Sequence, residues 1–226
     1  MTKANSLPLT VDESWLAMQA AGTLPPFKQL LLECQIDMRP EVLTAFEASD
    51  HIAGMLLESA KGAELSDGFM SGLADRIEQT TPEGSQPDAP QAPEDTDTPA
   101  WMPRPLAEYV HRSGRRVKWR RVGAGVQKAR LGRTPAGHRL YLLRAHAGVP
   151  IPKHTHKGQE WTLLLSGGYK TGQQQYVAGD LHQEDETAMH DLRIDADGPC
   201  ISLITDEGKL RFDSPFLNLL QPFLGL

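Results

Sequence analysis

The residues best suited to chemistry in this 226-residue chain lie in one short stretch, between Gly148 and Glu160. His154, His156 and Glu160 share parity, and side chains two positions apart in a strand point to the same face. A continuous strand would therefore direct two imidazoles and one carboxylate at a single surface. Because these groups are common metal ligands, the pattern predicts part of a metal site.

A fourth ligand comes from a later segment, where His190 follows an alanine and a methionine that suit the interior of a barrel. On an antiparallel neighbour of the first stretch, His190 would complete a set of three nitrogens and one oxygen. This set suits zinc, and also iron, manganese, nickel or copper, so it leaves the ion open. His182 is a further candidate, as an alternative ligand or a support to the site. Its position close to the Gly179–Asp180 turn predicts an exposed side chain.

The composition is that of a globular protein with a mild acidic excess and a formal net charge of −6. Such a charge gives no general attraction to nucleic acid. No apolar run reaches the roughly 20 residues that span a bilayer, and the first residues lack the apolar core of a secretory signal. Two distant cysteines, Cys34 and Cys200, form no disulfide framework. We therefore expect a cytoplasmic protein without a membrane segment.

Residues 1–79 are predicted to form a small helical bundle of four amphipathic helices. Asp12 is a suitable N-cap for the first, prolines at 25, 26 and 40 begin the second and third, and Ser66 precedes the fourth. So small a bundle buries little core by itself, so it needs a metal, a partner or the rest of the chain. Its apolar stripes are expected to pack internally rather than to form a partner surface.

Residues 80–104 are predicted to be a flexible linker. The stretch from Thr80 to Ala100 is rich in Pro, Asp, Glu, Ser and Thr and has almost no large apolar side chain. It cannot bury enough surface to offset the entropy lost on ordering. The linker divides the chain into two domains.

Residues 105–226 are predicted to form an all-β domain. Short strand patterns separated by glycine-containing turns, without helices between them, are typical of a closed sandwich or barrel. The metal ligands would then lie on an inward-facing strand of a small barrel. The predicted strands are Val117–Val122, Val126–Leu131, Arg139–Ala145, Trp161–Leu165 and Cys200–Thr205.

A basic stretch runs from Arg112 to Arg133. Trp119 is its only aromatic residue, and strand alternation would divide its charges between two faces, so we expect no direct contact with nucleic acid. A solvated outer face, or a surface for an acidic partner, is the favoured interpretation. Its basic residues are Arg112, Arg115, Arg116, Lys118, Arg120, Arg121, Lys128, Arg130 and Arg133.

These motifs resemble those of a known superfamily. Gly148-x5-His154-x-His156-x3-Glu160, the pair Gly167–Gly168, and Gly179–Asp180 followed by His190 resemble the two metal-binding motifs of the cupins. The flanks are similar to a narrower group, the ChrR-type anti-sigma factors, over nearly the whole chain. The segments that carry this similarity are Pro105–Tyr109, Trp119–Val126, Gly208–Gly225 and, at the start of the helical region, Asp12–Leu24.

The resemblance implies a cupin β-barrel of the jelly-roll type with one divalent metal ion held by His154, His156, Glu160 and His190. Zinc is favoured, with iron, manganese and nickel as alternatives. It also implies a helical domain that binds an extracytoplasmic-function-type sigma factor, and a cupin domain that is needed for release under singlet oxygen or organic peroxide. A homodimer through the cupin domain is compatible with this reading.

The helical region departs from the family pattern. Members hold a structural zinc through His-x3-Cys-x2-Cys and an upstream His, and the aligned residues here are Leu30, Cys34 and Asp37. One thiolate and one carboxylate are too few for a closed site, so we predict no zinc in the N-terminal domain. Apolar packing around Leu30 and Phe27 would have to replace it. Cys200 lacks the second thiol of a Cys-x-Cys pair and is expected to be a buried strand residue.

Two functions of different kinds follow. The first is an anti-sigma factor whose metal-bearing domain senses an oxidant. The second is a metal-dependent cupin enzyme, a dioxygenase or an isomerase, because three histidines and one glutamate leave coordination positions open. The sequence places no general base clearly, with His182 and Tyr169 as the only candidates, so whether the chain is an enzyme stays open and the first function is favoured.

Overall fold

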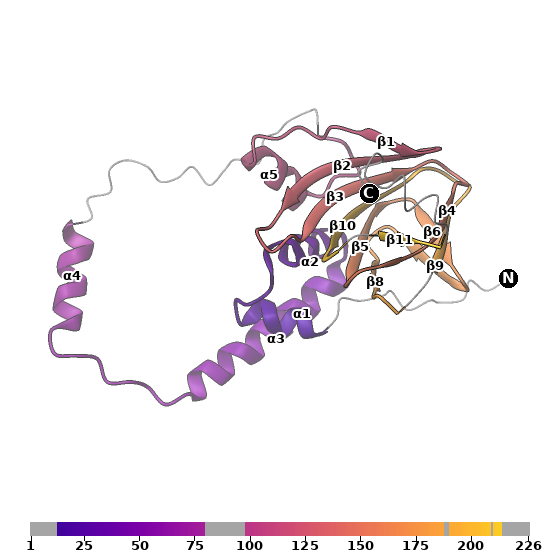
Figure 1. Ribbon diagram of the computed structural model, residues 1–226. Helices are drawn as coiled ribbons and strands as arrows, with labels where there is room; N and C mark the ends of the chain where they lie inside the picture. Colours follow the sequence, from indigo (N-terminus) through magenta and orange to yellow (C-terminus); the bar gives the residue numbers. More distant parts are fainter. Residues whose placement is uncertain (1–12, 80–97, 188–189, 209, 214–226) are drawn as a thin grey trace.

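The structure is a computed structural model that describes residues 13–79, 98–187, 190–208 and 210–213. In this part of the chain, five helices precede eleven strands (Figure 1). The side chains of His156, His190 and residues 210–212 lie outside the described part. The segment 80–97 lies outside it as well, so a flexible linker there stays a prediction.

The four expected helices are present at the expected places. They are α1 (Glu13–Ala20), α2 (Pro26–Met38), α3 (Pro40–Ser59) and α4 (Phe69–Gln79). A proline stands in the first turn of α2 and α3, where its missing N–H costs nothing. A fifth helix, α5 (Arg104–Arg112), was not expected. Glu108 of α5 lies 3.9 Å from Arg104 and 3.7 Å from Arg112, so one carboxylate supports both ends of this short helix.

The strands form two antiparallel sheets. The six-stranded sheet has the order β1-β2-β3-β10-β5-β8, and the five-stranded sheet has the order β11-β4-β9-β6-β7. No hydrogen-bonded strand pair joins the two sheets among the described residues, so the expected closed barrel is here a two-sheet sandwich. The strands are β1 (Arg120–Gly123), β2 (Val126–Arg133), β3 (Arg139–Ala145), β4 (Pro150–His156), β5 (Glu160–Ser166), β6 (Gly168–Thr171), β7 (Gln174–Val177), β8 (Leu181–Glu184), β9 (His190–Ile194), β10 (Cys200–Asp206) and β11 (Leu210–Phe212).

The six-stranded sheet has an outer face that the helices cover. Alternate residues of β3, β5 and β10, such as Leu142, Leu163 and Leu203, are fully buried in one core with Leu31 of α2 and Leu106 of α5. Both faces of these two strands are covered, since β10 is buried at every residue and β5 at every residue but its last. The helices α1, α2 and α5 therefore share a core with the sheet.

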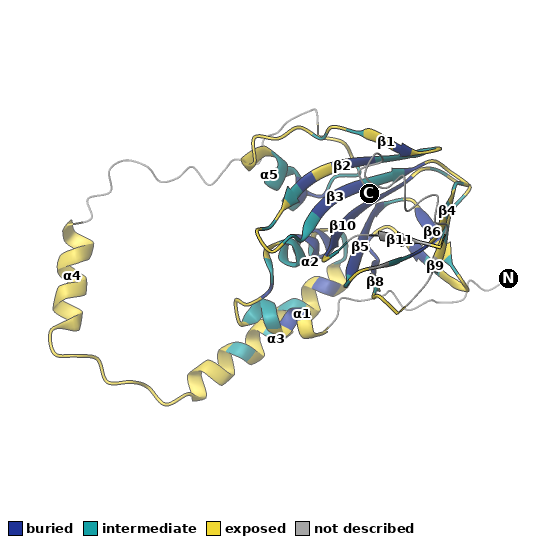
Figure 2. Ribbon diagram, in the orientation of Figure 1, coloured by how far each residue is buried: buried dark blue, intermediate teal, exposed yellow. Residues whose placement is uncertain are grey.

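The later part of the helical region is exposed. Every described residue from Gly54 to Gln79 is exposed, which Figure 2 shows as a continuous yellow segment through the end of α3 and all of α4. Large apolar side chains are among them, including Leu57 at 77% and Ile77 at 65% exposure. The expectation that these apolar stripes pack internally is wrong in this region. None of the described helices combines the length and apolarity that crossing a membrane requires.

Candidate metal site and the cavity between the sheets

The predicted ligands do not share one strand. Strand β4 ends at His156, and β5 begins at Glu160 after a turn. Gly158 in this turn has φ +94°, which an L side chain rarely adopts. The expectation of a continuous strand through these residues is therefore wrong. His154 belongs to the five-stranded sheet, whereas Glu160 belongs to the six-stranded sheet.

The two sheets nevertheless bring His154 and Glu160 to one place. Both line a cavity of about 330 Å³ whose walls come from both sheets. Its walls are mostly aliphatic, and a small number of polar side chains reach it, which is the usual character of a small-molecule site. The polar side chains used below are Lys128, Tyr141, His154, Glu160, Thr162 and Tyr169.

The hydrogen bond of His154 indicates which of its ring nitrogens would bind a metal. Its side chain is buried, and Nδ1 lies 2.7 Å from the backbone carbonyl oxygen of Pro152. A carbonyl can only accept, so Nδ1 donates the proton, and in the neutral imidazole Nε2 carries the lone pair. Hydrogen bonds of this kind orient most metal-binding histidines.

Glu160 is held by two hydroxyl groups. Tyr141 donates to Oε2 at 3.2 Å, and Thr162 donates to Oε1 at 3.3 Å. Burial, followed by the charges of Glu160 and Asp206, raises the pKa of Tyr141 well above its ordinary value. Tyr141 therefore stays a hydrogen-bond donor to Glu160 at neutral pH.

The backbone register places the other two predicted ligands close to these. In the antiparallel pair of β4 and β9, His190 is the Cα partner of His154, and His156 lies two residues farther along β4. Among the described side chains, no three His, Cys, Asp or Glu residues group closely enough to hold a metal. Because the side chains of His156 and His190 lie outside the described part, the four-ligand site stays a prediction. The donor chemistry of His154 and Glu160 fits it.

His182 is buried, contrary to the exposed position expected for it. Its Nε2 lies 2.7 Å from Glu184 Oε1, and its Nδ1 lies 2.6 Å from the Tyr169 hydroxyl. The carboxylate accepts from Nε2–H, so in the neutral imidazole Nδ1 accepts from Tyr169. The turn at Gly179–Asp180 misled the sequence interpretation because β8 pairs with the buried strand β5 directly after it.

The comparisons with known proteins agree with this architecture. The profile of the ChrR cupin-like domain matches residues 109–208. The anti-sigma-E factor ChrR of Cereibacter sphaeroides is 31% identical over 218 residues, which cover 96% of this chain and 97% of that protein. This chain belongs to the ChrR-type anti-sigma factors. The crystal structure of Rhodobacter sphaeroides SigE in complex with the anti-sigma ChrR matches with a TM-score of 0.69 and 28% identity, over 87% of this chain and 97% of that one.

Cys200, on β10 of this ChrR-type chain, lies at the cavity as a buried strand residue, as predicted. Burial raises the pKa of its thiol to about 11, and the Ser202 hydroxyl, 3.7 Å from Sγ, opposes this rise. In the helical region, burial raises the pKa of Cys34 well above its ordinary value, followed by the charges of Glu33 and Asp37. Leu30 is buried beside it, so apolar packing occupies the place of the family's zinc motif. The absence of zinc there stays a prediction.

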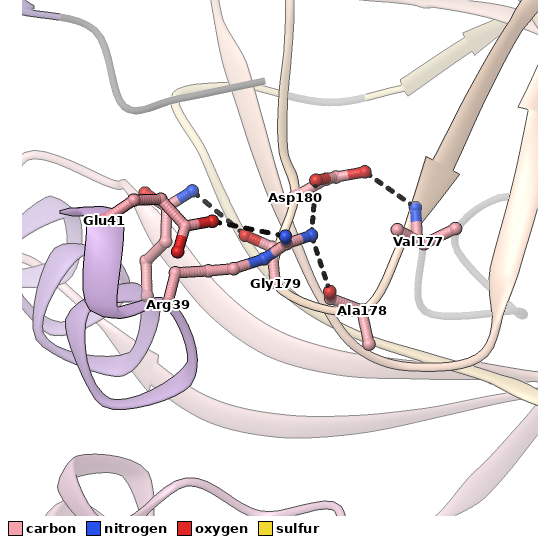
Figure 3. A network of polar contacts seen from close by, with 7 residues as sticks. Arg39, Glu41, Val177, Ala178, Gly179 and Asp180 are labelled. Atoms are coloured by element: carbon pink, nitrogen blue, oxygen red, sulfur yellow. Dashed lines mark hydrogen bonds and ion pairs between the residues drawn. The ribbon is translucent and has the colours of Figure 1, made fainter. Parts of the chain in front are cut away.

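The Gly179–Asp180 motif joins the cupin sheet to the helices, which the sequence analysis missed (Figure 3). Asp180 accepts from Val177 N–H and from Arg39 Nη2, both at 2.8 Å, and Arg39 also donates to the Ala178 carbonyl at 3.0 Å. Gly179 has φ +89°, and a Cβ there would collide with the Arg39 side chain. No local signal could reveal the pair, since 141 residues separate Arg39 from Asp180.

A second contact joins the helices to the strand that carries Glu160. The ring of Trp161, the next residue of β5, lies 5.9 Å from the ring of Trp15 of α1. The Lys28 ammonium of α2 stands 3.4 Å above the same Trp161 ring. One strand therefore faces the cavity with Glu160 and the helices with Trp161.

Proposed function

We propose that this ChrR-type anti-sigma factor binds an extracytoplasmic-function-type sigma factor through the exposed apolar side chains of α3 and α4. The observation that carries the proposal is the exposure of these apolar side chains. A relative in the same family has been solved in complex with a sigma factor. Large exposed apolar patches are unusual on a monomer and mark interaction sites. We define the α3–α4 apolar surface as Ile52, Met55, Leu56, Leu57, Leu65, Phe69, Met70, Leu73 and Ile77. The protein would act in the cytoplasm, where sigma factors engage RNA polymerase.

The cupin domain would hold one divalent metal, favouring zinc, through His154, His156, Glu160 and His190. What supports this is the His154 tautomer, the hydroxyl-held Glu160 carboxylate and the pairing of β4 with β9. A bound ion would fix the two sheets relative to each other, because its ligands come from both. Singlet oxygen or an organic peroxide is the proposed signal that changes this site.

The contacts between helices and sheet give a physical route for regulation. Arg39 stands directly before α3, which carries part of the α3–α4 apolar surface, and it is bound to Asp180 at the start of β8. To reverse a 1:99 balance between two arrangements, the signal must change their relative free energy by about 5.5 kcal/mol. Loss of metal–ligand bonds is a change of sufficient size.

The test of sigma binding uses the full chain and a sigma factor of this type encoded beside its gene. We expect a stable complex by co-purification, and at least about a 30-fold weaker affinity for the Leu56→Asp/Met70→Asp variant. Ala45→Asp/Ala74→Asp is the matched control, since it adds the same charges at exposed alanines of the same two helices. Two soluble proteins that form no complex would contradict the anti-sigma function. Equal affinities of the apolar-surface variant and wild type would contradict the surface.

A second candidate function is a metal-dependent cupin reaction, and one observation favours it. Tyr169, which lines the cavity, is hydrogen-bonded to His182, and His182 in turn to Glu184. A chain of this kind can move a proton to or from a bound molecule. Oxygen uptake on diketones and thiols by the metal-loaded protein, compared with Tyr169→Phe, would test it. Uptake that is absent, or equal in the variant, would argue against this role of Tyr169.

A further inference from the structure

Lys128 is the one member of the basic stretch that the structure buries deeply, with 4% of its surface exposed. It lines the cavity from β2, and its Nζ lies 3.6 Å from the centre of the Tyr141 ring. Within the described part of the chain, no carboxylate comes within ion-pair distance of this ammonium group. Burying a charge without a counter-ion is costly, and the cation–π contact compensates only part of the cost.

The ammonium remains available as a cation at neutral pH. Burial lowers the pKa of Lys128 to about 8, helped by Arg139, while Asp206 and Glu160 act in the opposite direction. A positive charge inside a mostly aliphatic cavity is the arrangement that recognises an anionic head group.

The strand register shows where the rest of a ligand would lie. On the six-stranded sheet, Lys128 pairs with Leu143, which pairs with Ser202. The next inward row along the same strands consists of Val126, Ala145 and Cys200. Side chains of β4 and β9 face this row across the cavity, namely Ile151, Leu192 and Ile194. The lining on this side is apolar, whereas Glu160 lies toward the other ends of the strands, in the row of Asp206 and Arg139.

We infer that the cavity binds a small monocarboxylate with an apolar tail, whose carboxylate pairs with Lys128 and whose tail packs on the row of Val126, Ala145 and Cys200. The Glu160 carboxylate is engaged by two hydroxyls and disfavours a second anion beside it, so the ligand head lies on the Lys128 side. On this side of the cavity, the Lys128 ammonium repels an amine head group. This inference concerns binding by the isolated chain, and it holds with or without a sigma partner.

The test uses octanoate, with octan-1-ol and octylamine as probes that have the same tail and a different head. Isothermal titration calorimetry on the full chain at pH 7 should give octanoate an affinity at least about tenfold higher than that of octan-1-ol or of octylamine. Lys128→Met keeps the apolar stem and removes the charge. It should lower the octanoate affinity at least about tenfold and leave that of octan-1-ol within about twofold.

Each measurement is made on metal-loaded and chelator-treated protein. The inference is overturned if octanoate and octan-1-ol bind equally, or if Lys128→Met binds octanoate as wild type does. It is also overturned if octanoate binds only to metal-loaded protein, since the carboxylate would then be a metal ligand. Failure of sigma binding would leave all these results unchanged, so the two proposals fail separately.

A measurement on wild type alone covers the case in which Lys128→Met does not fold. Octanoate affinity should fall as the pH rises above about 8, because the ammonium of the free protein loses its proton, and octan-1-ol affinity should stay constant. The charges of Arg130, Arg139, Glu160 and Asp206 act on Lys128, and Tyr141 is in contact with it. The other titratable groups that line the cavity are His154, Tyr169 and Cys200. An octanoate affinity that does not change from pH 7 to pH 10 would overturn the inference.

Discussion

The two faces of the six-stranded sheet are made from the same strands but have opposite characters. On β5, Trp161 and Leu163 point to the helices and belong to a closed apolar core. Glu160 and Thr162 alternate with them, and they line a cavity of about 330 Å³ with buried polar groups. One face is filled with side chains from α1, α2 and α5, whereas the other encloses space.

This difference indicates that the outward-facing residues of each strand stabilise the fold, while the inward-facing residues form a binding cavity. A closed aliphatic face gains stability from every methylene it buries, while a face that encloses a cavity and a few buried polar groups loses stability for the sake of binding. Substitutions on the outer face should therefore change the free energy of unfolding. Substitutions on the inner face should change what binds and leave unfolding little affected.

The largest expected effect comes from substitutions on the inner face, and it concerns metal binding without a loss of stability. His154→Ala/His156→Ala should reduce the metal content from about one ion per chain to none, because two of four ligands are lost. Metal content is measured by mass spectrometry on protein purified without a tag, with His51→Ala/His111→Ala, at exposed positions, as the control. After chelation, the double variant and wild type should unfold with free energies that agree within about 1 kcal/mol. Wild-type metal content in the double variant would refute the site.

On the outer face, we expect a substitution to lower stability and to leave metal binding unchanged. Leu163→Ala, at a fully buried position against the helices, should lower the free energy of unfolding by about 2–5 kcal/mol, with metal content unchanged. Leu56→Ala is the same substitution at a 67% exposed position of α3, and it should change stability by less than about 0.5 kcal/mol. Urea unfolding measures both. Equal losses at the two positions would show that the outer face is not the stabilising core.

The features that were predicted correctly depend on short-range patterns in the sequence. Prolines in the first turn and apolar periodicity predicted α1 to α4, and β3 was predicted with the bounds that the structure has. The predicted cap Asp12 lies outside the described residues. Cys200 was correctly placed in a buried strand, since its neighbours are apolar on both sides. The predicted metal ligands lie on the paired strands β4 and β9 and at the start of β5. The alternation of side chains in the sequence did not reveal the turn between β4 and β5.

The failures all depended on contacts between distant parts of the chain. Lys128 looked like one more charge in a basic stretch, yet its strand turns it inward toward Tyr141. His182 was expected to be exposed, but Tyr169 and Glu184 enclose it. Apolar stripes on α3 and α4 have the same local pattern as a buried stripe, and only the arrangement of the other elements leaves them uncovered.

The contact between Arg39 of the helical region and Asp180 of the cupin domain should have an intermediate effect on the free energy of unfolding. Arg39→Met removes the guanidinium that binds Asp180 and the Ala178 carbonyl, so we expect a loss of about 1–2 kcal/mol in the free energy of unfolding. Arg104→Met is the matched control, because its ion pair with Glu108 is 3.9 Å long and largely exposed, which predicts at most about 0.5 kcal/mol. Identical urea midpoints for the two variants would mean that Arg39 does not hold the helices on the sheet.

The smallest expected effect is a gain of stability on the inner face. Lys128→Met removes a buried ammonium, and since the cation–π contact with Tyr141 is lost as well, the free energy of unfolding at pH 7 should rise by only about 1 kcal/mol. The folded pKa of about 8 lies below the ordinary value of 10.5, so between these pH values the unfolded chain binds more protons than the folded one. Wild type therefore becomes more stable as the pH rises through this window, and the advantage of the variant shrinks. Urea unfolding at pH 7 and pH 9.5 measures the change. An advantage that grows at the higher pH would mean that the ammonium stabilises the fold, and the inner face would then resemble the outer one.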